Sequence, residues 1–213
     1  MIAVVDYGRG NLGSVEKAFA RVGIPAVVTQ DPRAVDEADA VVLPGDGAFH
    51  DAMENLERLG LLPALGRALD GRRPFLGICL GYQLLFSTSE EFGEGRGLDV
   101  IPGLVQRFPP GRKVPHMGWN RVRHAGDLRL FEGIPPGASF YFVHSYYPVV
   151  AGAASPAPGR PILRAAWCDY GVTFAAAIEQ GRIYATQFHP EKSQRWGLRL
   201  LENFAAIVKG GAR

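Results

Sequence analysis

Residues 75–83 read Phe-Leu-Gly-Ile-Cys-Leu-Gly-Tyr-Gln, and their pattern indicates how the chain folds around Cys79. An apolar run ends at Cys79, a helical pattern begins at Leu80, and Gly77 and Gly81 frame the cysteine. This spacing is typical of a nucleophile elbow, a sharp turn from strand to helix. Such a turn strains the backbone and requires neighbours without side chains. It also places the sulfur at a helix start, where thiolate is favoured and the Leu80 N–H can bind an oxyanion.

A lone cysteine in a strand is more commonly a buried structural thiol, so a second motif is needed. Residues 187–193 read Gln-Phe-His-Pro-Glu-Lys-Ser at the end of a predicted strand. His189 and Glu191 are two positions apart, so we expect both side chains on one face. The histidine can take and return a proton, and the carboxylate can fix its tautomer. With Cys79, they are the groups that nucleophilic acyl transfer needs.

The rest of the chain predicts an α/β fold. Continuous apolar strands are expected at residues 2–7, 25–29, 40–43 and 75–79, and helices between them at 11–22, 48–58 and 61–70. This alternation favours a parallel sheet covered on both faces. Shorter strands with Gly/Pro turns over 104–150 indicate an antiparallel section, followed by an exposed loop (151–161), a hairpin (174–187) and an amphipathic helix (196–208). We expect a single domain over residues 1–213, with a central mixed, largely parallel sheet flanked by helices, plus the antiparallel section.

Composition narrows the class of protein. Hydrophobic residues make up 47% of the 213 residues and the net charge is only +2, so neither disorder nor nucleic-acid binding is expected. No apolar run approaches the length of a membrane-spanning helix, and no signal peptide precedes Asp6, which points to the cytoplasm. Two cysteines, Cys79 and Cys168, make neither a disulfide framework nor a metal site. We expect no metal and no cofactor.

Together with Leu-Pro-Gly-Asp-Gly-Ala-Phe at residues 43–49, the two motifs resemble the class I (triad) glutamine amidotransferases. The resemblance extends from residue 2 to about residue 208. It implies that Cys79 attacks the side-chain amide of glutamine, that His189 transfers protons, and that Glu191 orients His189. Ammonia and glutamate are the implied products.

The resemblance also implies the groups around the reacting atoms. The oxyanion hole is expected from the Leu80 N–H and the loop at Gly45 and Asp46. Relatives often carry a small apolar residue in place of Asp46. A carboxylate that pointed toward the forming oxyanion would hinder it, so we expect the Asp46 side chain to point outward. The resemblance implies that this loop rests with its N–H turned away until the partner's ligand flips it, and the glycines at 45 and 47 make such a flip easy. We therefore expect low glutaminase activity without the cyclase partner. The implied substrate contacts are Gly47, Gln83 and the main chain of His144, Ser145 and Tyr146.

Three further strings narrow the resemblance. Residues 6–12 (Asp-Tyr-Gly-Arg-Gly-Asn-Leu), 115–120 (Pro-His-Met-Gly-Trp-Asn) and 141–146 (Tyr-Phe-Val-His-Ser-Tyr) are similar to those of the glutaminase subunits of imidazole glycerol phosphate synthases, in histidine biosynthesis. This implies a heterodimer with a (β/α)8-barrel cyclase, which would receive the ammonia and make imidazole glycerol phosphate and AICAR. The expected docking residues are Asn11, Met117, Trp119, Asn120, Tyr141 and Lys192.

Three alternatives stay open at this point. The chain could serve another synthase, such as one for anthranilate or aminodeoxychorismate, and the identity of the partner would decide. It could be a stand-alone γ-glutamyl hydrolase, which high activity of the isolated chain would favour. It could also be a silent regulatory subunit, which loss of thiol reactivity at Cys79 would favour.

Overall fold

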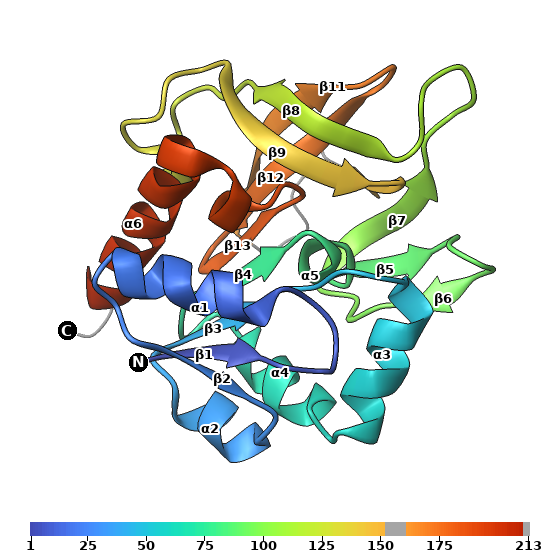
Figure 1. Ribbon diagram of the computed structural model, residues 1–213. Helices are drawn as coiled ribbons and strands as arrows, with labels where there is room; N and C mark the ends of the chain where they lie inside the picture. Colours follow the sequence, from blue (N-terminus) through green and yellow to red (C-terminus); the bar gives the residue numbers. More distant parts are fainter. Residues whose placement is uncertain (152–160, 211–213) are drawn as a thin grey trace.

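A seven-stranded sheet runs through the middle of the computed structural model, which describes residues 1–151 and 161–210 (Figure 1). The five neighbouring strands from β2 to β13 run parallel, and β12 and β11 continue the sheet antiparallel. Every residue of β1, β3 and β4 is buried, as expected for parallel strands covered on both faces. In sheet order the strands are β11 (Leu163–Asp169), β12 (Thr173–Gln180), β13 (Ile183–Thr186), β4 (Phe75–Ile78), β3 (Ala40–Leu43), β1 (Ile2–Val5) and β2 (Ala26–Thr29).

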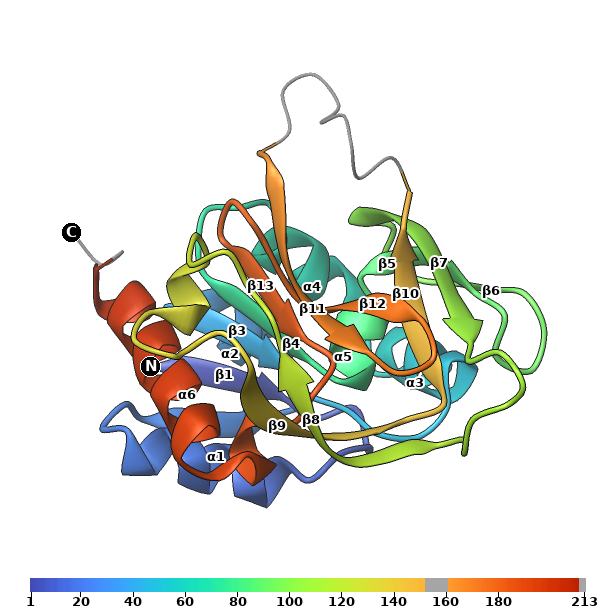
Figure 2. The same ribbon diagram turned by 90° about the horizontal axis from the view of Figure 1, so that it is seen from above.

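Helices cover both faces of this sheet and create two apolar cores. Alternate residues of β1 enter opposite cores: Ile2 and Val4 pack with α1 and α6, whereas Ala3 and Val5 pack with the helices behind the sheet. Figure 2 shows α1 and α6 on one side of the strands and α4 on the other. The face with Ile2 and Val4 is covered by α1 (Leu12–Arg21) and α6 (Gln194–Gly210). The face with Ala3 and Val5 is covered by α2 (Pro32–Glu37), α3 (Phe49–Arg58), α4 (Leu62–Ala68) and α5 (Leu80–Gln83).

Two smaller sheets extend this framework. The first has strand order β10-β7-β5-β6, from β5 (Phe86–Ser89), β6 (Gly95–Arg96), β7 (Ile101–Arg107) and β10 (Tyr146–Val150). The second is an antiparallel ribbon of β8 (His116–Val122) and β9 (Ala138–His144), in which His116 pairs with His144. Two short 3-10 helices, η1 (Arg129–Phe131) and η2 (Pro190–Lys192), complete the described elements.

The predicted fold class is confirmed, with differences in detail. The helix expected from Leu80 ends after four residues, because the chain turns directly into β5. Helix α2 was not predicted, although Asp31 caps it through Arg33 N at 2.9 Å and Pro32 begins it. Of the loop expected at 151–161, residues 152–160 lie outside the described residues.

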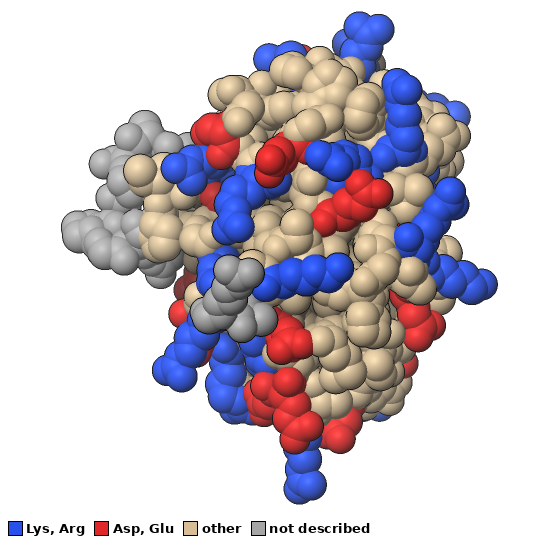
Figure 3. Space-filling view, turned by 90° about the vertical axis from the view of Figure 1, so that its left-hand side faces the viewer, with Lys and Arg blue, Asp and Glu red and all other residues tan. Residues whose placement is uncertain are grey.

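The surface carries no large region of one charge on the face seen in Figure 3. Basic and acidic side chains are interspersed there, as the net charge of +2 leads one to expect. Within residues 1–151 and 161–210, no helix has the length and apolar character needed to cross a bilayer. The same residues contain no cluster of three or more His, Cys, Asp or Glu side chains able to hold a metal ion.

Candidate active site

The site forms where two parallel strands end side by side. Ile78 of β4 pairs with Thr186 of β13, and Cys79 N donates to the Thr186 carbonyl oxygen at 2.7 Å. Both strands leave the sheet at its carboxyl edge, where parallel α/β sheets commonly place ligands. This register brings Cys79 next to residues 187–193, which lie far from it in sequence.

The elbow at Cys79 has the strained backbone that the glycine frame predicts. Cys79 adopts φ 54° and ψ −106°, a conformation that non-glycine residues rarely hold and that costs about 1–3 kcal/mol. A Cβ on Gly81 would lie 1.8 Å from the Leu43 carbonyl oxygen, and a Cβ on Gly77 would lie 2.8 Å from the Gly81 carbonyl oxygen. Close backbone packing therefore requires glycine at both positions.

His189 and Glu191 form a buried pair beside the sulfur. Glu191 Oε1 lies 2.8 Å from His189 Nδ1, so Nδ1 carries a proton and Nε2 is left for the reaction. His189 Nε2 is buried and, within the part of the chain that the structure describes, has no hydrogen-bond partner at normal distance. Burial lowers the pKa of His189, but its interactions with Cys79 and Glu191 outweigh burial and raise the pKa above its usual value. The pair is therefore arranged to hold a protonated imidazole beside the Cys79 sulfur.

His189 adds electrostatic support for Cys79 to that expected from the helix start. Helix α5 begins at Leu80, as expected, and has only four residues. The charged partner that the fold brings to Cys79 is His189.

A cavity of about 440 Å³ opens in front of the sulfur, a size that suits a small-molecule ligand. It brings together most of the predicted site residues, with His144 and its neighbours on one side and the loop after β3 on the other. A larger cavity of about 680 Å³ lies at the amino end of β13, but Cys79 and His189 do not line it. The smaller cavity is lined by Asp46, Gly47, Cys79, Leu80, Gln83, Glu91, Pro115, Val143, His144, Ser145, Tyr146, His189 and Lys192.

The loop after β3 is restrained by contacts with Tyr7 and Gly10. A Cβ on Gly45 would lie 1.9 Å from the Tyr7 hydroxyl oxygen, so only glycine fits there. Asp46 is exposed, and its carboxylate accepts the N–H of Gly10 at 3.0 Å. The carboxylate is thus directed to the neighbouring loop, in agreement with the outward orientation expected of it.

The chain matches known proteins over almost its whole length. Residues 3–208 match the family model of class-I glutamine amidotransferases. The chain is 51% identical over 208 residues to the imidazole glycerol phosphate synthase subunit HisH of Moorella thermoacetica, covering 98% of this chain and 95% of that one. It is 52% identical over 209 residues to the HisH subunit of Methanothermobacter thermautotrophicus, covering 98% of this chain and 100% of that one. The chain belongs to the HisH family of class-I glutamine amidotransferases.

Solved structures of glutamine amidotransferases have the same fold. One glutamine amidotransferase superposes with a TM-score of 0.70 at 22% identity, covering 98% of this chain and 100% of the other. A glutamine amidotransferase from Thermotoga maritima gives a TM-score of 0.63 at 18% identity, covering 100% of this chain and 90% of the other. The resemblance drawn from the sequence motifs is confirmed, and this chain is an amidotransferase subunit of the HisH type.

Among the cavity residues that the sequence analysis did not assign to the site (Glu91, Pro115 and Val143), only Glu91 is charged. Glu91 follows β5 and lines the cavity, and its Oε2 accepts the N–H of Phe49 at 2.8 Å. Burial raises the pKa of Glu91, partly offset by this hydrogen bond. No local pattern marks Glu91, because β5 reaches the cavity only through the second sheet.

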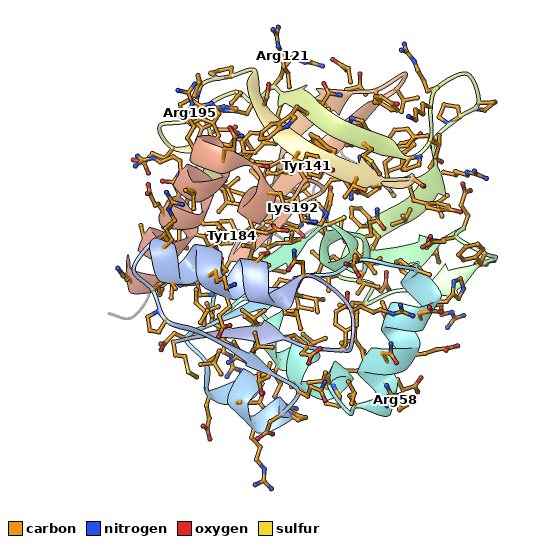
Figure 4. All side chains as sticks on the ribbon, viewed as in Figure 1. Arg58, Arg121, Tyr141, Tyr184, Lys192 and Arg195 are labelled. Atoms are coloured by element: carbon orange, nitrogen blue, oxygen red, sulfur yellow. The ribbon has the colours of Figure 1, made fainter. Side chains whose placement is uncertain are left out.

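The expected docking residues of this HisH family member lie on two different faces of the ribbon. Met117 and Trp119 are 61% and 49% exposed, and the Trp119 ring packs edge-on against Tyr141 at 6.1 Å between ring centroids. Tyr141 on β9 and Lys192 on η2 are labelled in Figure 4. Asn120, by contrast, turns inward, because alternate residues of a strand face opposite sides. Its Nδ2 lies 3.2 Å from His116 Nε2 and 3.0 Å from the Asp169 carbonyl oxygen.

Proposed function

We propose that Cys79, His189 and Glu191 are the triad with which this amidotransferase hydrolyses glutamine. The supporting observation is the His189–Glu191 pair, whose side chains are buried, together with the cavity that Cys79 and His189 both line. The Cys79 thiolate attacks the side-chain carbonyl carbon of glutamine. His189 then protonates the departing ammonia, which leaves a glutamyl thioester. Water deprotonated by His189 hydrolyses the thioester to glutamate and regenerates the thiolate.

Backbone donors hold the charge that develops during this attack. We propose the Leu80 N–H as one donor and an N–H of residues 45–47 as the second. Leu80 and Gly47 both line the cavity, and the elbow places Leu80 directly after the nucleophile. Removing one such donor costs about 3–4 kcal/mol of transition-state stabilisation in comparable sites.

The cavity also contains groups that suit the amino-acid end of glutamine. Glu91 supplies a carboxylate for the α-ammonium group, and Gln83 with the main chain of residues 144–146 supplies polar contacts. Lys192 lines the same cavity and is the cation available to the α-carboxylate. These opposite charges orient the substrate with its amide toward Cys79.

We propose further that the ammonia passes to a cyclase subunit, which makes imidazole glycerol phosphate and AICAR. The relatives named above are subunits of imidazole glycerol phosphate synthase, which supports this assignment. The exposed pair Met117 and Trp119, with Tyr141 beside it, is an apolar and aromatic patch of the kind that anchors protein partners. The docking surface is proposed to comprise Asn11, Met117, Trp119, Tyr141 and Lys192.

The deciding experiment is glutamine hydrolysis by the purified chain, alone and with a cyclase subunit plus its nucleotide ligand, alongside Cys79→Ala. Activity that appears with the liganded partner and disappears in Cys79→Ala is the expected result. High activity without a partner would instead favour a stand-alone hydrolase. Trp119→Ala should weaken partner binding about tenfold or more, whereas Trp167→Ala, at an exposed tryptophan on β11, should not.

A further inference from the structure

Gln187 opens the motif that contains His189, yet the mechanism above gives it no role. The side chain is fully buried directly after β13. Its Nε2 lies 3.7 Å from Cys79 Sγ, and its Oε1 accepts from Gln83 Nε2 at 3.1 Å. A buried amide between the nucleophile and a cavity residue therefore needs an explanation.

The direction of the Gln187 amide follows from its neighbours. The oxygen and nitrogen ends of an amide have nearly the same shape, so hydrogen-bond partners must determine which end points where. The Tyr146 carbonyl oxygen can only accept, and it lies 2.9 Å from Gln83 Nε2. Gln83 must therefore present its NH2 group there, and the second hydrogen reaches Gln187 Oε1. Gln187 is left with its own NH2 group directed at the Cys79 sulfur.

Two buried histidines hold the Tyr146 carbonyl in place. His144 Nδ1 lies 2.8 Å from the same oxygen, so this nitrogen carries the hydrogen and His144 Nε2 is an acceptor. His116 Nδ1, 2.9 Å from His144 Nε2, must then be the donor, and His116 Nε2 accepts from Asn120. Burial lowers the pKa of His116 to about 4 and that of His144 to about 3. Both rings are therefore neutral, as this series of hydrogen bonds requires.

We propose that Gln187 is a further catalytic residue, whose side-chain N–H donates to the Cys79 sulfur and stabilises the thiolate. The proposal rests on the assignment of Cys79 as the nucleophile. The Val143 carbonyl oxygen lies 3.9 Å from the sulfur and is a partner for the neutral thiol. The Val143 carbonyl thus favours the protonated sulfur, whereas the N–H of Gln187 favours the deprotonated one. The positioning residues that fix its direction are Asn120, His116, His144, Tyr146 and Gln83.

This role predicts how the reactivity of Cys79 depends on pH. The ionisable groups that interact with the sulfur are His189 and Tyr7. Burial raises the pKa of Tyr7, so its hydroxyl stays neutral. Further charged groups at the cavity wall are Asp46, Glu91 and Lys192. None of these changes in a Gln187 variant, so the pH at which alkylation by iodoacetamide reaches half its maximum isolates the amide.

The test measures this midpoint for the full chain, with Cys79 followed by peptide mass spectrometry. Gln187→Met keeps the side-chain length without the N–H and should raise the midpoint by about one pH unit, equivalent to tenfold less thiolate at low pH. Gln187→Glu keeps the shape, adds a negative charge and should raise the midpoint further. Gln180→Met is the matched control, because that amide binds the Pro161 carbonyl far from the sulfur.

The outcomes separate this proposal from the proposed function. If wild-type Cys79 does not react with iodoacetamide, the nucleophile assignment itself fails. If wild type reacts and folded Gln187→Met has an unchanged midpoint, only the role of Gln187 is overturned. Should Gln187→Met fail to fold, Gln187→Leu, which also lacks the N–H and adds no charge, decides by the same criterion.

A second pair of variants tests the direction of the hydrogen bonds that run from Asn120 to the Tyr146 carbonyl. In His144→Asn the amide nitrogen replaces Nδ1 and can still donate to the Tyr146 carbonyl, whereas in His144→Gln the amide lies near the position of Nε2 and cannot. The shift in the alkylation midpoint and the rise in glutamine KM should therefore be larger for His144→Gln. The opposite order would mean that the ring only fills space, and would overturn the directed chain.

Discussion

At the scale of single residues, the site combines partners that are close in sequence with others that are distant. His189 is raised in basicity by a carboxylate two residues away and by a sulfur contributed by another strand. Glu91 enters the cavity from the second sheet. Each of these contacts predicts a different kinetic effect, because the first is proposed to act on the reacting atoms and the second on the bound substrate.

Replacing Glu191 should impair the chemical step. In Glu191→Gln the amide can no longer stabilise the imidazolium or enforce a proton on His189 Nδ1, and the pKa of His189 should fall. We expect kcat for glutamine hydrolysis, measured with the liganded partner, to drop about 100-fold or more. Circular dichroism serves as the check on folding, and a kcat within threefold of wild type would exclude Glu191 from the triad.

Replacing Glu91 should impair binding instead. Glu91→Gln removes the negative charge proposed to face the α-ammonium group, so the KM for glutamine should rise about tenfold with a smaller change in kcat. Glu94→Gln is the matched control, because Glu94 is exposed on the neighbouring turn. Equal KM values for the two variants would contradict the contact between Glu91 and the substrate.

At the scale of elements, the elbow between β4 and α5 has little conformational freedom. Its glycines face backbone carbonyl oxygens at distances that no Cβ tolerates. The strand on one side and the short helix on the other are both buried, so the turn cannot relax outward. Strain at Cys79 is therefore maintained by packing on both sides.

A pair of glycine substitutions tests this element. Gly81→Ala forces a Cβ toward the Leu43 carbonyl oxygen and should destabilise the fold by about 3 kcal/mol or more, or prevent folding. Gly66→Ala, in α4, meets nothing within 4 Å and should stabilise the protein by about 0.5–1 kcal/mol. Urea unfolding of both variants measures the difference, and similar midpoints would contradict the packing argument.

At the scale of the whole molecule, the β8–β9 ribbon carries both the buried pair His116 and His144 and the exposed residues proposed for docking. His116 and Asn120 point inward from β8, while Met117 and Trp119 point outward from the same strand. A partner that binds the outer face therefore lies one strand thickness from groups that support the cavity.

The buried histidines predict acid sensitivity of the whole fold. Their folded pKa values, about 4 for His116 and about 3 for His144, lie below the ordinary 6.5, so the unfolded chain binds more protons between these limits. The stability they contribute is present above pH 6.5 and is lost as the pH falls toward about 4. His189 does not oppose this loss, because its raised pKa acts above pH 6.5.

Urea unfolding at several pH values between 7 and 4 checks this. The free energy of unfolding should decrease with falling pH, and more gradually in His116→Asn, which lacks one of the two groups. Identical slopes for variant and wild type would show that His116 does not contribute.

Much of this protein was determined by local sequence. The buried apolar strands β1, β3 and β4 and the glycine-framed Cys79 follow from periodicity and side-chain chemistry within a few residues, and the structure has them where they were expected. The early end of α5, the entry of Glu91 into the cavity and the inward turn of Asn120 were decided only by tertiary structure. The same holds for the direction of the Gln187 amide. These features depend on contacts between segments distant in the chain, and their register and hydrogen-bond partners exist only once the sheets have packed.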